Sequence, residues 1–178
     1  MQDMIILGLL QFTPMSSYDI KKKIERSTSN FYNASMGSIH PALKKLTTKR
    51  AVTIEEKIDN GRLKRIYTIS PLGIEMFNQW LDDGIGVKNS KDPALAKLFF
   101  MGFTDKSAQV MHLKNHIIAL NQKYIHLKLL QDEFAGVTAP EGLEDHLIYQ
   151  MATLDYGVEG VKFSRDWYKK LLAKIDNQ

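Results

Sequence analysis

The sequence predicts a mainly α-helical fold in two domains, a small helical domain that carries one β-hairpin and a longer, purely helical domain. Three observations lead to this prediction. Apolar residues recur at helical spacing through most of the chain. Two β-prone runs, 52–57 and 63–69, flank Asn60-Gly61, the strongest short signal for a hairpin turn. Two long amphipathic segments fill the second half. We therefore expect domains at 1–83 and 92–178, joined by a linker at 84–91.

The composition is that of an ordinary globular protein. Of its 178 residues, 44% are hydrophobic and 25% are charged. The absence of cysteine excludes disulfides, thiolate metal sites and cysteine nucleophiles, and it suits a reducing cytoplasm. The apolar run Met4–Leu10 is far shorter than the roughly 20 residues needed to cross a bilayer. We therefore expect a soluble, cytoplasmic protein with no membrane association.

Positive charge is concentrated in the first half of the chain. Residues 1–80 hold twelve Lys and Arg against seven Asp and Glu, whereas residues 81–178 hold twelve against thirteen. An excess of this kind favours binding to a polyanion, because neutralising phosphates releases condensed counterions. An excess of five charges is also compatible with an ordinary solvated surface, so charge alone does not decide between the two.

Local signals place the first two helices. Met4–Leu10 is apolar on almost every side, which predicts a buried helix. Ser16 stands three residues before Asp19, the spacing of a capping box, so a second helix begins there. Ile20 and Ile24 are four residues apart and are expected to face inward. The rim of this helix carries cations that can reach phosphates, namely Lys21, Lys22 and Lys23.

A third helix is expected around Pro41. A proline lacks an amide hydrogen and fits best in a first turn, which places the N-cap at the helix start near Gly37 or Ser38 and the helix body through about Arg50. One face is apolar and is expected to be buried, through Ile39, Leu43 and Leu46. The opposite face is small, polar and cationic, which suits the major groove of DNA; it carries Ser35, Ser38, Pro41, Lys44, Lys45, Thr47 and Thr48.

The hairpin and a closing helix complete the first domain. The hairpin tip and return strand concentrate the cations Arg62, Lys64 and Arg65, which can lie along a DNA backbone. Ser70-Pro71 starts a fourth helix, whose Ile74, Phe77 and Leu81 are expected to continue the core. This order of elements is typical of a winged helix-turn-helix with a two-stranded wing. The expected DNA-binding residues are Lys21, Lys22, Ser35, Ser38, His40, Lys44, Lys45, Arg62, Lys64 and Arg65.

The second half has the pattern of a helical dimerisation domain. Asp92-Pro93 starts a short helix that ends near Gly102, and Thr104 and Asp105 start a long one. Apolar residues alternate at spacings of four and three, as in a coiled coil, in this helix and in a second long one after a break at 136–140. Antiparallel packing of the two hides one seam of each and leaves Ile148, Phe163 and Trp167 in need of cover. We therefore expect a homodimer over a monomeric helical hairpin, with contacts through Leu113, Ile117, Leu120, Leu154, Val158, Val161 and Trp167.

The sequence resembles the PadR family of bacterial transcriptional regulators, in its long form. The resemblance rests on 6–10, 17–20, 37–46, 62–67, 71–73 and the segment 95–100. Ser17, His40 and Ala51 depart from its pattern, which has glycine, tyrosine and glycine at these positions. The resemblance implies a homodimeric repressor that binds an operator in double-stranded DNA, and two-fold pairing of the chains makes that operator an inverted repeat. It also implies that a small molecule, such as a phenolic acid or another toxic compound, releases the operator.

No enzyme signature is visible. His112 and His116 have the i, i+4 spacing of two metal ligands, but the sequence offers no obvious third ligand, so we expect neither a metal nor another cofactor. An effector pocket is expected where the two domains meet, built from Tyr18, Asn33, His40, Trp80, Tyr149 and Met151. The alternative function is a non-enzymatic scaffold or adaptor, in which the winged domain contacts proteins instead of DNA.

Overall fold

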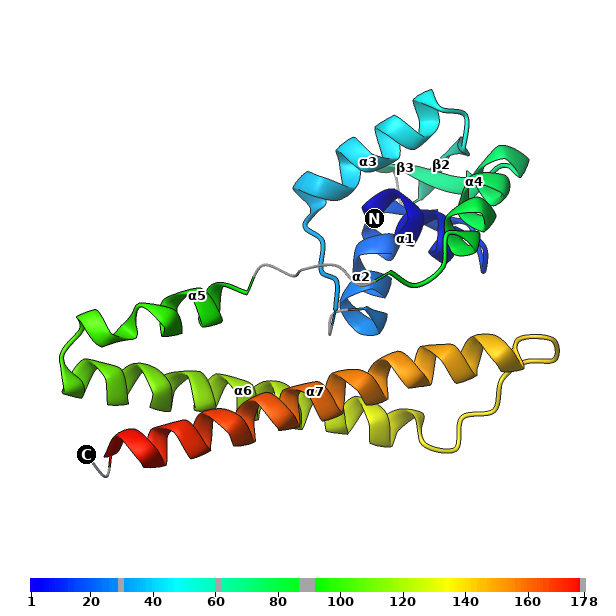
Figure 1. Ribbon diagram of the computed structural model, residues 1–178. Helices are drawn as coiled ribbons and strands as arrows, with labels where there is room; N and C mark the ends of the chain where they lie inside the picture. Colours follow the sequence, from blue (N-terminus) through cyan, green and yellow to red (C-terminus); the bar gives the residue numbers. More distant parts are fainter. Residues whose placement is uncertain (29–30, 60–61, 87–91, 177–178) are drawn as a thin grey trace. The chain divides into compact units, whose positions relative to one another are not determined.

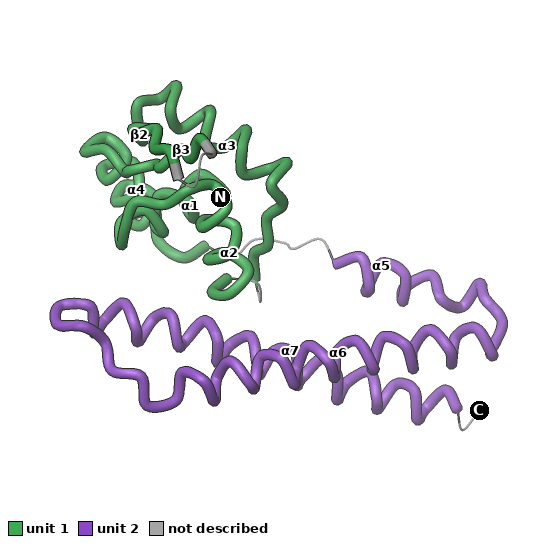
Figure 2. The backbone as a smooth tube through the Cα atoms, turned by 180° about the vertical axis from the view of Figure 1, so that it is seen from behind, with its two compact units in different colours: residues 1–88 green, residues 89–178 purple. Residues whose placement is uncertain are grey.

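The computed structural model describes residues 1–28, 31–59, 62–86 and 92–176. The chain divides into two compact units, residues 1–88 and 89–178, and each is described by itself (Figure 2). The turn residues Asn60 and Gly61, and residues 87–91 of the expected linker, lie outside the described residues.

The described residues of the first unit form four helices and a small antiparallel sheet (Figure 1). The sheet has the strand order β1-β3-β2, so β3 lies in its middle. The expected helices and hairpin are therefore confirmed. The short strand β1 was not predicted, because two residues are too few to show an alternating pattern. In chain order the elements are α1 (Gln2–Leu10), β1 (Met15–Ser16), α2 (Ser17–Ser27), α3 (Met36–Thr48), β2 (Val52–Asp59), β3 (Arg62–Ile69) and α4 (Pro71–Asp82).

The predicted apolar stripes of the first three helices form the core of this unit. Burial of one such side chain stabilises the fold by about 1.5–3 kcal/mol, so this cluster provides most of the energy that holds α3 against α1 and α2. Its fully buried members are Ile6, Leu7, Ile20, Ile24, Ile39, Leu43 and Leu46.

Helix α3 begins earlier than expected. Its N-cap is Ser35, whose carbonyl oxygen accepts hydrogen bonds from the amides of Ser38 and Ile39, both at 3.0 Å. Pro41 therefore lies inside the helix and not in its first turn, so the expected start at Gly37 or Ser38 was wrong. The amide that proline lacks would have bonded the carbonyl of Gly37, and this residue is exposed, so water can satisfy that carbonyl.

Helix α4 starts as predicted but packs with a different face. The Ser70 hydroxyl accepts a hydrogen bond from the amide of Gly73 at 3.1 Å, and Pro71 is the first helical residue. Met76 and Phe77 pack against the core, whereas Ile74 and Leu81 are exposed. The expectation that Ile74 and Leu81 belong to the core was wrong, because the face of α4 that meets the core carries Gly73, Met76 and Phe77.

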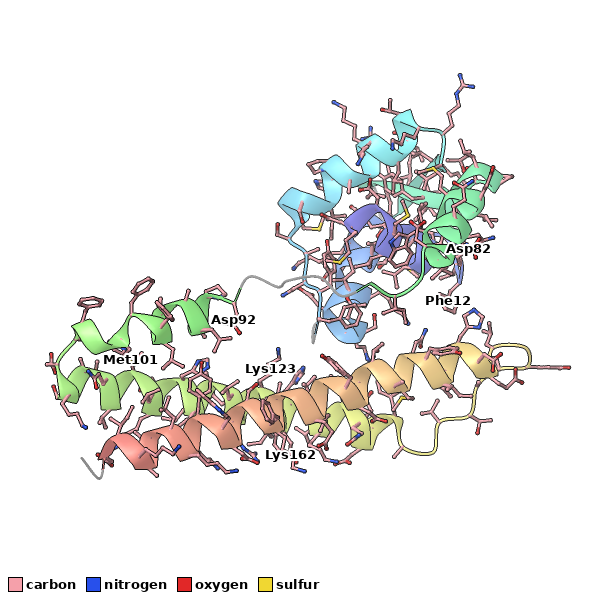
Figure 3. The ribbon with its side chains drawn as sticks, in the orientation of Figure 1. Phe12, Asp82, Asp92, Met101, Lys123 and Lys162 are labelled. Atoms are coloured by element: carbon pink, nitrogen blue, oxygen red, sulfur yellow. The ribbon has the colours of Figure 1, made fainter. Side chains whose placement is uncertain are left out.

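The second unit is a long helical hairpin preceded by a short helix. It comprises α5 (Pro93–Phe99), the 3₁₀ turn η1 (Met101–Phe103), α6 (Lys106–Phe134) and α7 (Glu144–Asp176). Helices α6 and α7 lie antiparallel, side by side (Figure 1). Asp92 caps α5, at the start of that helix in Figure 3. Asp105 alone caps α6, since the Thr104 hydroxyl donates to Met101 instead. No described helix is long and apolar enough to span a membrane.

The seam expected to join two chains is largely the contact between α6 and α7 of one chain. Leu113, Val158 and Val161 are buried within the unit, and Leu120 and Leu154 pack against the buried cluster. Ile117 is half-buried. The expected antiparallel packing of the two long helices is therefore confirmed, and it already covers most of the residues that were expected to contact a second chain. Trp167 is the one residue of the expected dimer set that is exposed.

Candidate nucleic-acid interface

A groove of about 1260 Å³ lies between α3 and the β2–β3 hairpin in the first unit. We call it the α3–β3 groove. Helix α3 contributes its outer face, β3 contributes two cations, and the start of α2 closes one end. Its lining residues are Ser16, Ser17, Tyr18, His40, Lys44, Thr47, Thr48, Ile54, Leu63, Lys64, Arg65 and Tyr67.

The α3 side of the groove is built by helical spacing. His40, Lys44, Thr47 and Thr48 stand at i, i+4, i+7 and i+8 and share one face, opposite the buried stripe. The hydroxyls of Thr47 and Thr48 donate to the carbonyls of Leu43 and Lys44, at 2.9 and 3.0 Å. Each hydroxyl oxygen therefore keeps accepting capacity toward the groove, beside the cationic Lys44.

Two expected DNA-binding residues of α3 point elsewhere. The Ser38 hydroxyl accepts a hydrogen bond from the Gln2 side chain at 3.2 Å and donates to the Ser35 carbonyl at 2.9 Å. Lys45 Nζ lies 2.7 Å from Asp3 Oδ2. Both side chains face α1, so neither lines the α3–β3 groove. Ser35 is exposed at the N-cap of α3, and it does not line the groove either.

The cations of α2 lie beside the groove and not in it. Lys21 pairs with Glu25 along the helix at 3.0 Å. Lys22 Nζ stands 4.7 Å from the centroid of the Tyr18 ring, a cation–π contact. Tyr18 itself lines the groove and is 57% exposed, so Lys22 adds positive charge at the groove edge.

The two hairpin cations that line the groove are both held by carboxylates. Lys64 Nζ lies 3.7 Å from Asp19 Oδ2, and Arg65 Nε lies 2.9 Å from Glu56 Oε1. The hydrogen bond and charge of Glu56 raise the pKa of Arg65, which keeps its charge at any working pH. Arg62 pairs with Asp59 in the strand register, and its side chain lies outside the described part.

The end of the groove at α2 is fixed by a capping box. Asp19 accepts hydrogen bonds from the Ser16 hydroxyl at 2.6 Å and the Ser16 amide at 3.3 Å, while the Asp19 amide donates to the Ser16 hydroxyl. The Ser16 hydrogen bonds and the charges of Lys64 and Lys22 lower the pKa of Asp19. Ser17 follows directly, and its hydroxyl lies 3.4 Å from His40 Nε2.

Several residues that line the groove were not predicted from the sequence to contact DNA. Ser17 and Tyr18 were not expected to contact DNA, although they follow the capping box and so sit at the exposed start of α2. Thr47 and Thr48 were seen on the outer face of α3 but were not singled out. The helical spacing from His40 was the signal that could have selected both.

The residues expected to form an effector pocket are not brought together in the first unit. Tyr18 and His40 line the α3–β3 groove, but Asn33 and Trp80 do not. Trp80 packs against Phe77 on α4, at 5.8 Å between ring centroids. Tyr149 and Met151 belong to the second unit.

Within the described residues, no group of three or more His, Asp or Glu side chains is placed to hold a metal ion. His116, one of the two histidines at i, i+4 spacing, packs its ring edge-on against Tyr168 at 4.5 Å. This contact gives His116 a packing role.

Two family models match the chain, one in each unit. The model described as transcriptional regulator PadR-like family matches residues 6–79, and the model described as virulence activator alpha C-term matches residues 90–176. The chain is 25% identical over 173 residues to the negative transcriptional regulator PadR of Bacillus subtilis (strain 168), covering 96% of this chain and 95% of that protein.

Solved structures match the fold over both units. The crystal structure of Bacillus subtilis PadR in complex with operator DNA has a TM-score of 0.82 at 24% identity, covering 97% of this chain and 98% of that one. The same protein in complex with p-coumaric acid has a TM-score of 0.75 at 23% identity, covering 98% of each chain. Both the winged first unit and the helical second unit therefore have counterparts in these structures.

Proposed function

This chain belongs to the PadR-like family of transcriptional regulators, and from that premise we propose that it is a homodimeric repressor that binds operator DNA through the α3–β3 groove. The main support for the proposal is the set of residues that line this groove. The polar face of α3, with Lys44 at its centre, lies opposite Lys64 and Arg65 of β3. Cations on two sides of a polar, concave surface are what a duplex requires.

Each side of the groove has its own task in this proposal. Helix α3 enters the major groove, where His40, Lys44 and Thr48 reach base edges or flanking phosphates. The β2–β3 hairpin follows the backbone, where Lys64 and Arg65 bind phosphates without reading sequence. The start of α2 lies at the groove end and positions Ser17 and Tyr18 toward the DNA.

The second unit supports the homodimer. After α6 and α7 have packed together, large apolar side chains of both remain exposed, among them Leu129, Ile148 and Phe163, the last of which is 71% exposed. A second copy of the chain would cover such surface, and two-fold pairing would present two α3 helices to successive major grooves about 34 Å apart. An inverted-repeat operator follows from that symmetry. The expected division into a DNA-binding domain (1–83), a linker (84–91) and a dimerisation domain (92–178) is part of this proposal.

The name and ligands of the Bacillus subtilis relative support the regulatory part. That protein is a negative regulator, and it has been solved with operator DNA and with p-coumaric acid. We extend this to a repressor that acts in the cytoplasm and leaves its operator when it binds a phenolic acid or another toxic compound. Such an effector has to bind the operator-incompetent state more tightly, since a ligand shifts an equilibrium only by its differential affinity.

Footprinting of the full-length protein on the DNA upstream of its own gene tests the proposal. We expect a protected inverted repeat that is lost in Lys44→Ala and retained in Lys45→Ala, because only Lys44 lines the groove. Protection that is equally strong in both variants would overturn the assignment of the groove. Absence of any protected site on duplex DNA would overturn the regulatory function.

A further inference from the structure

The three cations that line the α3–β3 groove are not equivalent. Lys44 has no carboxylate partner within the described part of the chain, whereas Arg65 and Lys64 are both paired with carboxylates. Glu56, which pairs with Arg65, is its direct neighbour across the hairpin. Asp19, which pairs with Lys64, comes from another element, helix α2, and is not needed to hold the hairpin together. The contact between Asp19 and Lys64 is therefore not explained by stabilisation of the β2–β3 hairpin.

The Asp19 carboxylate is fixed in place. The hydroxyl and the amide of Ser16 both donate to Asp19 Oδ2, at 2.6 and 3.3 Å. Ser16 is in turn paired with Ile66 in β3, the strand that carries Lys64. These bonds lower the pKa of the carboxyl, so the group stays ionised at neutral pH. Because the bonds anchor its side chain, Asp19 cannot easily turn away when DNA approaches.

A fixed negative charge next to a phosphate-binding lysine opposes DNA binding. A phosphate that approaches Lys64 has to share the ammonium group with Asp19 and is repelled by the carboxylate. Neither side chain is buried, at 45% exposed for Asp19 and 40% for Lys64, so solvent screens the effect without removing it.

We propose that Asp19 is a restraining residue of the DNA-binding groove: it holds Lys64 in the DNA-free protein and thereby limits the affinity for DNA of arbitrary sequence. This inference rests on the proposed function. Binding to DNA of arbitrary sequence consists almost entirely of phosphate contacts. A lysine whose charge is partly neutralised by a carboxylate therefore weakens this nonspecific binding directly. Base contacts from α3 are a separate source of affinity, available only at an operator.

The test measures binding of the full-length protein to a duplex of mixed sequence without an operator, as a function of KCl concentration. Asp19→Asn removes the charge and keeps an amide oxygen that accepts the Ser16 hydrogen bonds. We expect it to bind this duplex roughly three- to tenfold more tightly than wild type at low salt. The slope of log affinity against log salt should steepen by up to about 0.9, the value for one additional phosphate contact.

Further variants show whether the effect acts through Lys64. In the Lys64→Ala background, Asp19→Asn should lose most of its gain. Asp3→Asn is the matched control, because it removes the same charge from the pair with Lys45, which does not line the groove; it should change the affinity far less. Asp19→Gln, which retains a capping-box residue type, replaces Asp19→Asn if circular dichroism shows that the latter is unfolded.

The inference is supported only if the gain appears in Asp19→Asn, depends on Lys64 and exceeds that of Asp3→Asn. Unchanged or weaker binding by Asp19→Asn overturns it, as does an equal gain without Lys64 or in the control. These results leave the proposed function standing, since wild type still binds DNA. If wild type binds no duplex at all, the proposed function fails and the inference fails with it.

Discussion

The imidazole Nε2 of His40 lies 3.4 Å from the hydroxyl oxygen of Ser17. His40 is on α3 and Ser17 is the first residue of α2, so the contact joins the two helices of the helix-turn-helix at the α3–β3 groove. In the pattern that the sequence resembles, these positions carry tyrosine and glycine. The two departures therefore meet in space, where the Ser17 hydroxyl can orient the imidazole of His40.

This coupling makes a prediction about operator binding. His40→Ala should weaken binding to the footprinted operator about tenfold, the scale of one lost contact to DNA. Ser17→Ala should weaken it less, and it should add almost nothing when His40 is already alanine, because its part is to orient the imidazole. Fluorescence anisotropy titrations of the two single variants and the double variant measure this. Independent, additive losses would show that the two side chains act separately.

The capping box predicts a pH-dependent contribution to stability. Ser16→Ala should lower the free energy of unfolding of the first unit by about 1 kcal/mol at neutral pH. Because the pKa of Asp19 is lowered in the folded protein, its stabilisation is complete above the ordinary Asp pKa and disappears as the pH falls through the folded value. The difference in free energy of unfolding between wild type and Ser16→Ala should therefore become smaller in acid. Urea unfolding followed by Trp80 fluorescence, in a Trp167→Phe background, measures it.

Ser70→Ala is the matched control for that experiment. Ser70 caps α4 through its hydroxyl, which accepts from the Gly73 amide and donates to the Arg50 carbonyl at 2.7 Å, and no titratable side chain takes part in these bonds. Ser70→Ala should lower the free energy of unfolding by a similar amount at neutral pH, and this loss should stay constant on acidification. A Ser16→Ala deficit that is equally constant would contradict the role given to the Asp19 carboxylate.

Gly73 is predicted to tolerate no side chain. A Cβ at this position would lie 2.1 Å from the Ala51 carbonyl oxygen and 2.8 Å from Ile69 Cγ1. Backbone has to move to relieve the first contact, so Gly73→Ala should lower the free energy of unfolding by about 1–3 kcal/mol or more. Gly37→Ala in α3, where the nearest atom would be 3.6 Å away, should be neutral or slightly stabilising. Equal melting temperatures for the two variants would contradict the packing of α4.

The exposed apolar face of α7 should carry the dimer contact. Phe163 and Trp167 are one helical turn apart and both are exposed in the single chain. The double variant Phe163→Asp/Trp167→Asp should therefore give a monomer mass in light scattering at micromolar concentration, where wild type gives a dimer. Val158→Ala should reduce stability but keep the dimer mass, since Val158 is buried between α6 and α7 of its own chain. A dimeric double variant would place the interface elsewhere.

Local signals allowed much of the fold to be predicted from the sequence. The capping box at Ser16, the Ser70-Pro71 helix start and the buried stripe of α3 involve residues within a few positions of one another, so spacing alone determines them. The start of α3 was placed too late because proline usually marks a first turn, and nothing local showed that the exposed Gly37 would tolerate it inside a helix.

The features that were missed depend on contacts between distant residues. Lys45 and Ser38 are polar residues of α3, as Lys44 is, and the sequence predicted all three to contact DNA. In the structure, Asp3 and Gln2 of α1 hold Lys45 and Ser38 away from the groove. In the same way, the coiled-coil spacing of α6 and α7 predicted that the two helices pack together, but it did not show which of their apolar residues this packing covers. Periodicity identifies a face, and only the fold identifies what covers it.

The salt dependence of DNA binding by the full-length protein decides whether the α3–β3 groove binds phosphates. If six or more phosphates are bound, the affinity for the footprinted operator should fall by about three orders of magnitude between roughly 50 and 200 mM salt. Lys64→Ala should flatten the slope of log affinity against log salt, by less than the roughly 0.9 of one full phosphate contact because Asp19 shares the charge of Lys64, and Lys45→Ala should leave the slope unchanged. Duplex binding that is absent at the lowest salt, or a slope that responds equally to both substitutions, would contradict this account.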